Sequence, residues 1–70
     1  MTDEMKMVLF VLNIFVENTD YSKNDVAVIE PTDCENEFNI VTQDGIIWYA
    51  NIKTLEFSNI GVFGDTTLQQ

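Results

Sequence analysis

The 70-residue sequence predicts an all-β fold, a small five-stranded antiparallel barrel or a strongly twisted sheet. Three observations favour it: short apolar runs alternate with polar turn clusters, an Asp-Gly pair separates two of those runs, and 46% of the residues are hydrophobic. This length corresponds to one small domain, residues 1–70, whose ends at 1–4 and 65–70 are expected to fray.

The first apolar segment, residues 5–17, admits two interpretations. As a helix it would be apolar on every side, which is typical of a fully buried or membrane element. As a strand it has a suitable content of β-branched and aromatic residues, including Val8, Phe10 and Ile14. We predict a strand, and we expect part of its apolar surface to meet another subunit or a partner.

The next predicted strand is "DVAVIE", residues 25–30, which follows the polar cluster at 18–25. Its alternation places Val26 and Val28 on one face and Ala27 and Ile29 on the other. Pro31 should end this strand or lie at a sheet edge, because proline has no N–H to donate.

Residues 37–52, "EFNIVTQDGIIWYANI", predict a β-hairpin around Asp44-Gly45. A two-residue turn would pair Val41 with Trp48, whereas a three-residue loop over 43–45, with Gly45 at positive φ, pairs Ile40 with Trp48. The three-residue loop is preferred because it keeps the apolar residues together on one buried face. That face comprises Phe38, Ile40, Ile46, Trp48, Ala50 and Ile52. A second, partly apolar face carries Val41, Ile47 and Tyr49.

Leu55 and Phe57 precede a short last strand at residues 60–64, which brings the predicted total to five strands. Closing them into a barrel would remove exposed edges.

Residues 24–57 resemble the small SH3-like barrels of the KOW/Tudor type, and in particular the short SH3-like proteins encoded by tailed phages. The matching positions are Asp25-Val26, Asp44-Gly45, Trp48-Tyr49 and Leu55-Glu56. The resemblance implies an SH3-like barrel that serves as a binding or adaptor module and has no catalytic residue.

The net charge of the chain limits the kinds of molecule that it is expected to bind. Twelve acidic residues against three lysines, without arginine or histidine, give a net charge of −9. Such a chain repels nucleic acids and anionic lipid, because affinity for phosphate comes from Lys and Arg. Direct nucleic-acid binding and membrane binding are therefore not expected, and a protein with a basic surface is the expected partner. The single cysteine, Cys34, and the absence of a secretory signal predict a cytoplasmic location, in the host if the protein is viral.

The acidic stretch "EPTDCENE", residues 30–37, allows three interpretations: a calcium loop, a docking surface, or a solvated strand face. Asp33, Glu35, Glu37 and Asp44 occupy positions 1, 3, 5 and 12 of a calcium loop, but position 6 requires glycine and holds Phe38. No metal or other cofactor is therefore predicted. Period-2 alternation would instead place the acids at 33, 35 and 37 on one outward strand face. The residues predicted to bind a partner are Glu30, Asp33, Glu35, Glu37, Asp44, Tyr49 and Glu56.

The sequence contains no recognisable set of catalytic residues, so the protein is not predicted to be an enzyme. Cys34 and the serines have no histidine to act as a base, and the three glycines form no phosphate-binding loop. We expect a non-enzymatic inhibitor of the phage type, which docks on the nucleic-acid-binding surface of a host enzyme or defence complex and imitates a nucleic acid. The alternative is an assembly protein that forms a homodimer or larger oligomer through its apolar N-terminal segment.

Overall fold

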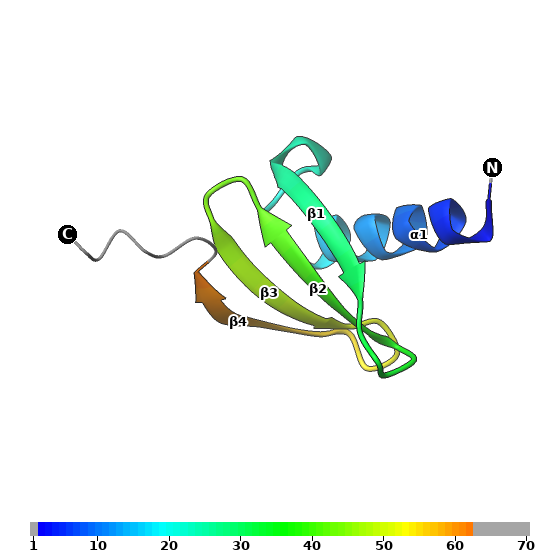
Figure 1. Ribbon diagram of the computed structural model, residues 1–70. Coiled ribbons are helices and arrows are strands. Elements are labelled where there is room, and N and C mark those ends of the chain that lie inside the picture. The colour runs from blue at the N-terminus through cyan, green and yellow to red at the C-terminus, as the bar shows by residue number, and fades with distance from the viewer. Residues whose placement is uncertain (1, 63–70) are drawn as a thin grey trace.

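The computed structural model describes residues 2–62, which form a four-stranded antiparallel sheet with a helix on one face (Figure 1). The strands follow each other in the order β1-β2-β3-β4, so each pairs with its neighbour in the sequence. The elements are α1 (Asp3–Asn18), η1 (Lys23–Asp25), β1 (Val26–Pro31), β2 (Glu37–Thr42), β3 (Ile46–Asn51) and β4 (Glu56–Val62).

The prediction of a strand over residues 5–17 is wrong, because this segment is helix α1. The helix begins where Thr2 caps it: the Thr2 hydroxyl accepts a hydrogen bond from the Met5 N–H at 3.2 Å. Asp3 and Glu4 form its first turn, where the helix dipole favours acidic groups. The expected fraying at 65–70 lies outside the described residues.

The chain is mostly sheet, as predicted, but the all-β class is corrected to a sheet with one helix. Within residues 2–62 the sheet is open, with β1 and β4 at its edges, so these residues form four strands and no closed five-stranded barrel. The predicted last strand at 60–64 overlaps β4 at residues 60–62, but β4 starts earlier, at Glu56, and residues 63–64 lie outside the described part of the chain. No helix in this part of the chain has the length and apolar content to cross a membrane.

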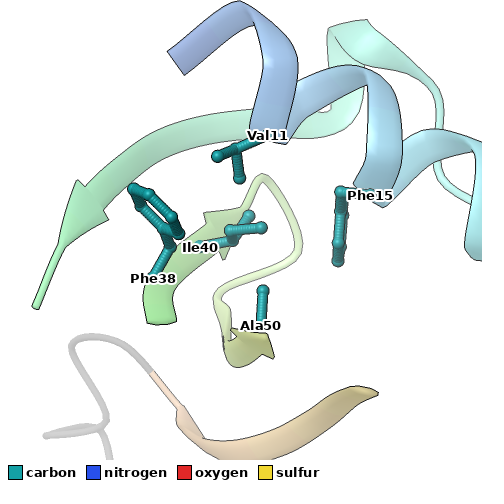
Figure 2. Packing of buried hydrophobic residues seen from close by; sticks show 5 residues of the cluster. All are labelled: Val11, Phe15, Phe38, Ile40 and Ala50. Carbon is teal, nitrogen blue, oxygen red and sulfur yellow. The ribbon is translucent and has the colours of Figure 1, made fainter. Parts of the chain in front are cut away.

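The hydrophobic core lies between α1 and the sheet. Val11 and Phe15, one helical turn apart, are fully buried against Phe38, Ile40 and Ala50 (Figure 2). The sheet therefore buries one side of α1 and leaves the others exposed.

Aromatic rings extend this core. The ring centroid of Phe15 lies 5.6 Å from that of Tyr21, 6.2 Å from that of Trp48 and 5.8 Å from that of Phe57. Trp48 thus faces the core, as predicted. Because the buried ring of Phe15 fills the space between the other three, the group is a packing cluster and offers no open cage for a ligand.

A bulge in β1 changes the predicted alternation. The register shifts between Val26 and Val28, so Ala27 is an extra residue opposite β2. As a result Val26 and Ile29 pack together against the core, and Val28, predicted to share a face with Val26, is 43% exposed. The prediction for Pro31 is confirmed, since it is the last residue of an edge strand.

The hairpin of β2 and β3 confirms the predicted three-residue loop. Ile40 pairs with Trp48 and Phe38 with Ala50. The Gly45 N–H donates to the Thr42 carbonyl at 2.9 Å, and Gly45 has a φ of 85°. A left-handed residue at this position matches the right-handed twist of the two strands.

Gly45→Ala is expected to lower the free energy of unfolding by about 1–2 kcal/mol, because a Cβ disfavours left-handed backbone. Gly61→Ala is the matched control: the nearest atom to its added Cβ would be the Ile47 Cδ1, at 4.0 Å, and no strain is expected. Urea denaturation of both variants measures the difference. Equal losses in the two variants would contradict this account of the turn.

Candidate functional site

The sheet has a second face, opposite the one that α1 covers, and its residues follow from the strand register. We call it the open face. Three cross-strand rows make it up: Val28–Val41–Ile47–Gly61, Glu30–Asn39–Tyr49–Ser58 and Glu37–Asn51–Glu56. Every one of these residues is half-buried or exposed, so the face is available for contact.

The carboxylates of the open face gather toward one end. Glu37 and Glu56 lie in the row nearest the β1–β2 and β3–β4 connections, and Glu30 lies in the next row, on edge strand β1. Neighbouring strands are about 4.8 Å apart, so the backbones of Glu37 and Glu56, with β3 between them, are about 10 Å apart. Such a spread of charge can face several lysine or arginine side chains at once.

Tyr49 lies in the middle of the open face, with Asn51 beside it on β3. The Asn51 side-chain amide donates to the Tyr49 hydroxyl at 3.2 Å. Its carbonyl oxygen accepts from the backbone N–H groups of Lys53 at 2.9 Å and Thr54 at 3.0 Å. The turn after β3 therefore holds Asn51, and Asn51 orients Tyr49. Since the Tyr49 oxygen accepts this bond, its own proton can be donated to a partner.

The other end of the open face is apolar. Val28, Val41 and Ile47 are consecutive members of one cross-strand row. Together with the ring of Tyr49 they give a strip that can exclude water beside the carboxylates. Interfaces between proteins commonly combine an apolar centre with a charged margin.

The predicted site residues lie in three places: on the open face, in the β1–β2 turn and, for Asp44 alone, in the β2–β3 turn. Glu30, Glu37, Tyr49 and Glu56 lie on the open face. Asp33 and Glu35 are exposed in the turn between β1 and β2, so the predicted strand ladder of acids at 33, 35 and 37 is wrong.

The polar sequence of that turn explains why it leaves the strand. The Thr32 hydroxyl accepts from the Cys34 N–H at 3.1 Å and donates to the Glu37 carbonyl at 2.9 Å. The Ile52 N–H donates to the Asn36 carbonyl at 2.9 Å, which joins this turn to the β3–β4 connection (Figure 1). Asp33 and Glu35 are thereby kept at the acidic end of the sheet.

Asp44 lies in the β2–β3 turn, at the opposite end of the sheet, and supports the fold. Its carboxylate accepts from the Tyr21 hydroxyl at 2.7 Å, from the Thr42 hydroxyl and, at 3.4 Å, from the Ile46 N–H. The hydrogen bonds from Thr42 and then Tyr21 hold the pKa of Asp44 below its ordinary value of 3.8. This carboxylate therefore links the segment after α1 to the hairpin.

Asp44→Asn is expected to lower the melting temperature at pH 6 and to have little effect near pH 2. A folded-state pKa below the unfolded one means that ionised Asp44 stabilises the fold above about pH 4, and that this contribution is lost as the pH falls through the folded pKa. Thermal unfolding of both proteins between about pH 2 and 6 measures it. A difference in melting temperature that stays constant across this range would contradict the assignment.

A shallow depression of about 290 Å³ lies beside Asp44, lined by Asp20, Tyr21, Asp25, Gln43 and Asp44. Across residues 2–62, no three acidic or cysteine side chains are grouped so that they could hold a metal ion. The depression thus has acidic walls without the geometry of a metal site.

Cys34 is exposed in the β1–β2 turn. The charge of Glu37, and then a hydrogen bond with the same side chain, raises the pKa of the Cys34 thiol. A raised pKa keeps the thiol protonated at neutral pH, which makes it a poor nucleophile.

The sequence did not single out Val28, Asn39 or Asn51 as site residues. The place of Val28 depends on the bulge in β1, which alternation does not reveal, whereas Asn39 and Asn51 follow by alternation from the second face that carries Val41 and Tyr49. Comparison of the chain with family models, curated proteins and solved structures found no match.

Proposed function

We propose that this chain is a non-enzymatic binding module of the cytoplasm whose open face docks on a basic, nucleic-acid-binding surface of another protein and blocks it. The observation that carries the proposal is the register of the sheet. It gathers Glu30, Glu37 and Glu56 beside Tyr49, on the face that α1 does not cover.

Charge supports the choice of partner. With a net charge of −9 and three lysines in 70 residues, the chain attracts basic proteins over a long range and repels nucleic acids. Electrostatic complementarity mainly accelerates association and excludes wrong partners. The carboxylates of the open face would supply that selectivity.

Contact at short range would come from the middle of the open face. Tyr49 has a fixed orientation and a hydroxyl that can donate, and Val41 and Ile47 border it. Tyrosine is enriched among the residues that dominate binding energies, because it combines apolar area with a polar tip. A basic side chain of the partner would lie against the carboxylates while its apolar neighbours cover this strip.

Capture of the tagged protein's partners from a lysate of the source or host cell tests the proposal. At low salt we expect a basic nucleic-acid-binding protein, released by added duplex DNA and weakened by about 1 M salt, at which the Debye length is about 3 Å. DNA should release it because both ligands would compete for one surface. A captured protein that DNA does not displace, or binding that high salt leaves unchanged, would contradict the proposal.

A further inference from the structure

Helix α1 is apolar around most of its circumference, and the sheet covers only one side of it. Val11 and Phe15 are fully buried, whereas Met5 is 55% exposed, Leu9 43% and Phe10 53%. The first turns of α1 extend beyond the sheet (Figure 1). This much exposed apolar side chain on one element indicates an interaction surface.

One stripe of α1 has the spacing of a helix-pairing seam. Met5, Leu9, Leu12 and Val16 are separated by four, three and four residues, which is the spacing of core positions in a coiled coil. At 3.6 residues per turn they fall within about 60° of the circumference, about 100° around the helix from the side that faces the sheet. We call these four residues the α1 seam.

The α1 seam is partly buried at its C-terminal end and exposed to solvent at its N-terminal end. Val16 packs against the core cluster and Leu12 is half-buried, whereas Leu9 and Met5 are exposed. A hollow of about 330 Å³ lies along the exposed part, lined by Glu4, Met5, Val8 and Leu9. A helix laid against the seam would extend the core of the protein.

We propose that the α1 seam pairs with the same seam of a second copy, as an antiparallel two-helix interface. The spacing is the same in both directions: the midpoint of residues 5 and 16 coincides with that of residues 9 and 12. A two-fold axis there sets Met5 against Val16 of the other copy, and Leu9 against Leu12. An interface that matches itself about a two-fold axis is the usual basis of a homodimer.

The charges of α1 favour the antiparallel orientation. Lys6 lies near the start of the helix and Glu17 near its end, on the same flank of the seam. The two-fold axis brings Lys6 of one copy toward Glu17 of the other, whereas parallel pairing would leave these two charges about 16 Å apart along the helix axis. Antiparallel helix dipoles add a small contribution of the same sign.

The dimer leaves the proposed docking surface free, because α1 covers the opposite face of the sheet. One dimer would therefore present two open faces, and a partner with two basic sites could bind both with increased avidity. The seam is short and its interface smaller than the standard size, so we expect a dissociation constant of about 1–100 μM.

Sedimentation equilibrium from about 0.5 to 500 μM, a range chosen to bracket that constant, tests the dimer. The wild type should fit a monomer–dimer equilibrium. Leu9→Glu should weaken it at least about tenfold, because the seam would bury an unpaired charge. Phe10→Glu, of similar exposure but on another side of α1, should leave the equilibrium unchanged. A monomer throughout, larger oligomers, or equal weakening by the two variants would overturn the proposal.

The orientation is tested by disulfide formation in a Cys34→Ser background, which removes the native exposed thiol. Met5→Cys alone should remain uncrosslinked, because antiparallel pairing holds the two copies of residue 5 about 16 Å apart along the helix axis. A mixture of Met5→Cys and Val16→Cys should form a mixed disulfide dimer. Crosslinking of Met5→Cys with itself would overturn the antiparallel arrangement.

Discussion

Replacing Phe15 with alanine is expected to unfold a large fraction of the protein at room temperature. The Phe15 side chain is fully buried and contacts aromatic rings from three other segments: Tyr21 after α1, Trp48 on β3 and Phe57 on β4. Removing a buried phenylalanine costs about 3–5 kcal/mol, through lost apolar transfer and the cavity left behind. A folded chain of 70 residues has a total stability of only about 4–10 kcal/mol.

Phe10→Ala is the control for this experiment, because Phe10 is on the same helix and 53% exposed. It should cost less than about 1 kcal/mol. Urea denaturation followed by circular dichroism measures both variants. A loss below about 1.5 kcal/mol for Phe15→Ala, or similar losses in the two variants, would show that α1 does not hold the sheet as described.

Neutralising the carboxylates of the open face is expected to weaken binding to the basic partner about 10–100-fold. The variant carries Glu30→Gln, Glu37→Gln and Glu56→Gln. Each lost contact at a partly exposed interface is worth about 0.5–1 kcal/mol, and the three together give this range. The loss should shrink at high salt, which already screens these contacts. Titration of the captured partner, by calorimetry at low and high salt, measures it.

A matched variant separates this surface from bulk charge. Asp3→Asn, Glu4→Gln and Asp20→Asn also take the net charge from −9 to −6, but they change residues on and just after α1. Binding should fall less than about threefold in this variant, through weaker long-range steering alone. Equal losses in the two triple variants would mean that net charge, and no particular face, governs binding.

Local signals in the sequence were sufficient to predict the hairpin. Asp44-Gly45 marks the turn, and keeping Phe38, Ile40 and Trp48 on one buried face selects the three-residue loop. The same reasoning placed Tyr49 on the face opposite Trp48. Both predictions succeed because a hairpin is held by contacts between residues close in the sequence.

Helix α1 was missed because its residues are apolar on every side, so the 3.6-residue period is hidden. β-branched residues and phenylalanine in the segment also favoured a strand. The signal that could have identified the helix was at its start: Thr2 can cap a helix, and Asp3 and Glu4 suit a first turn. The sequence indicated that part of this apolar surface would remain uncovered, but it did not indicate which part, because that depends on how α1 lies on the sheet.

The open face was only partly predictable, because it depends on two bulges and on a turn. The bulges, at Ala27 in β1 and at Ile60 in β4, shift which residues share a side. The turn at 32–36 removes Asp33 and Glu35 from the strand that alternation assigned to them. The acidic residues of the face therefore come from three strands instead of one.

Photocrosslinking from the open face tests the central claim most directly. A benzophenone side chain would replace Tyr49 in one protein and Phe10 in another, and each would be irradiated with the captured partner. We expect a crosslink from position 49 to a basic, nucleic-acid-binding segment of the partner, and none from position 10. A crosslink from position 10 alone would mean that the partner binds α1, and the assignment of the open face would be wrong.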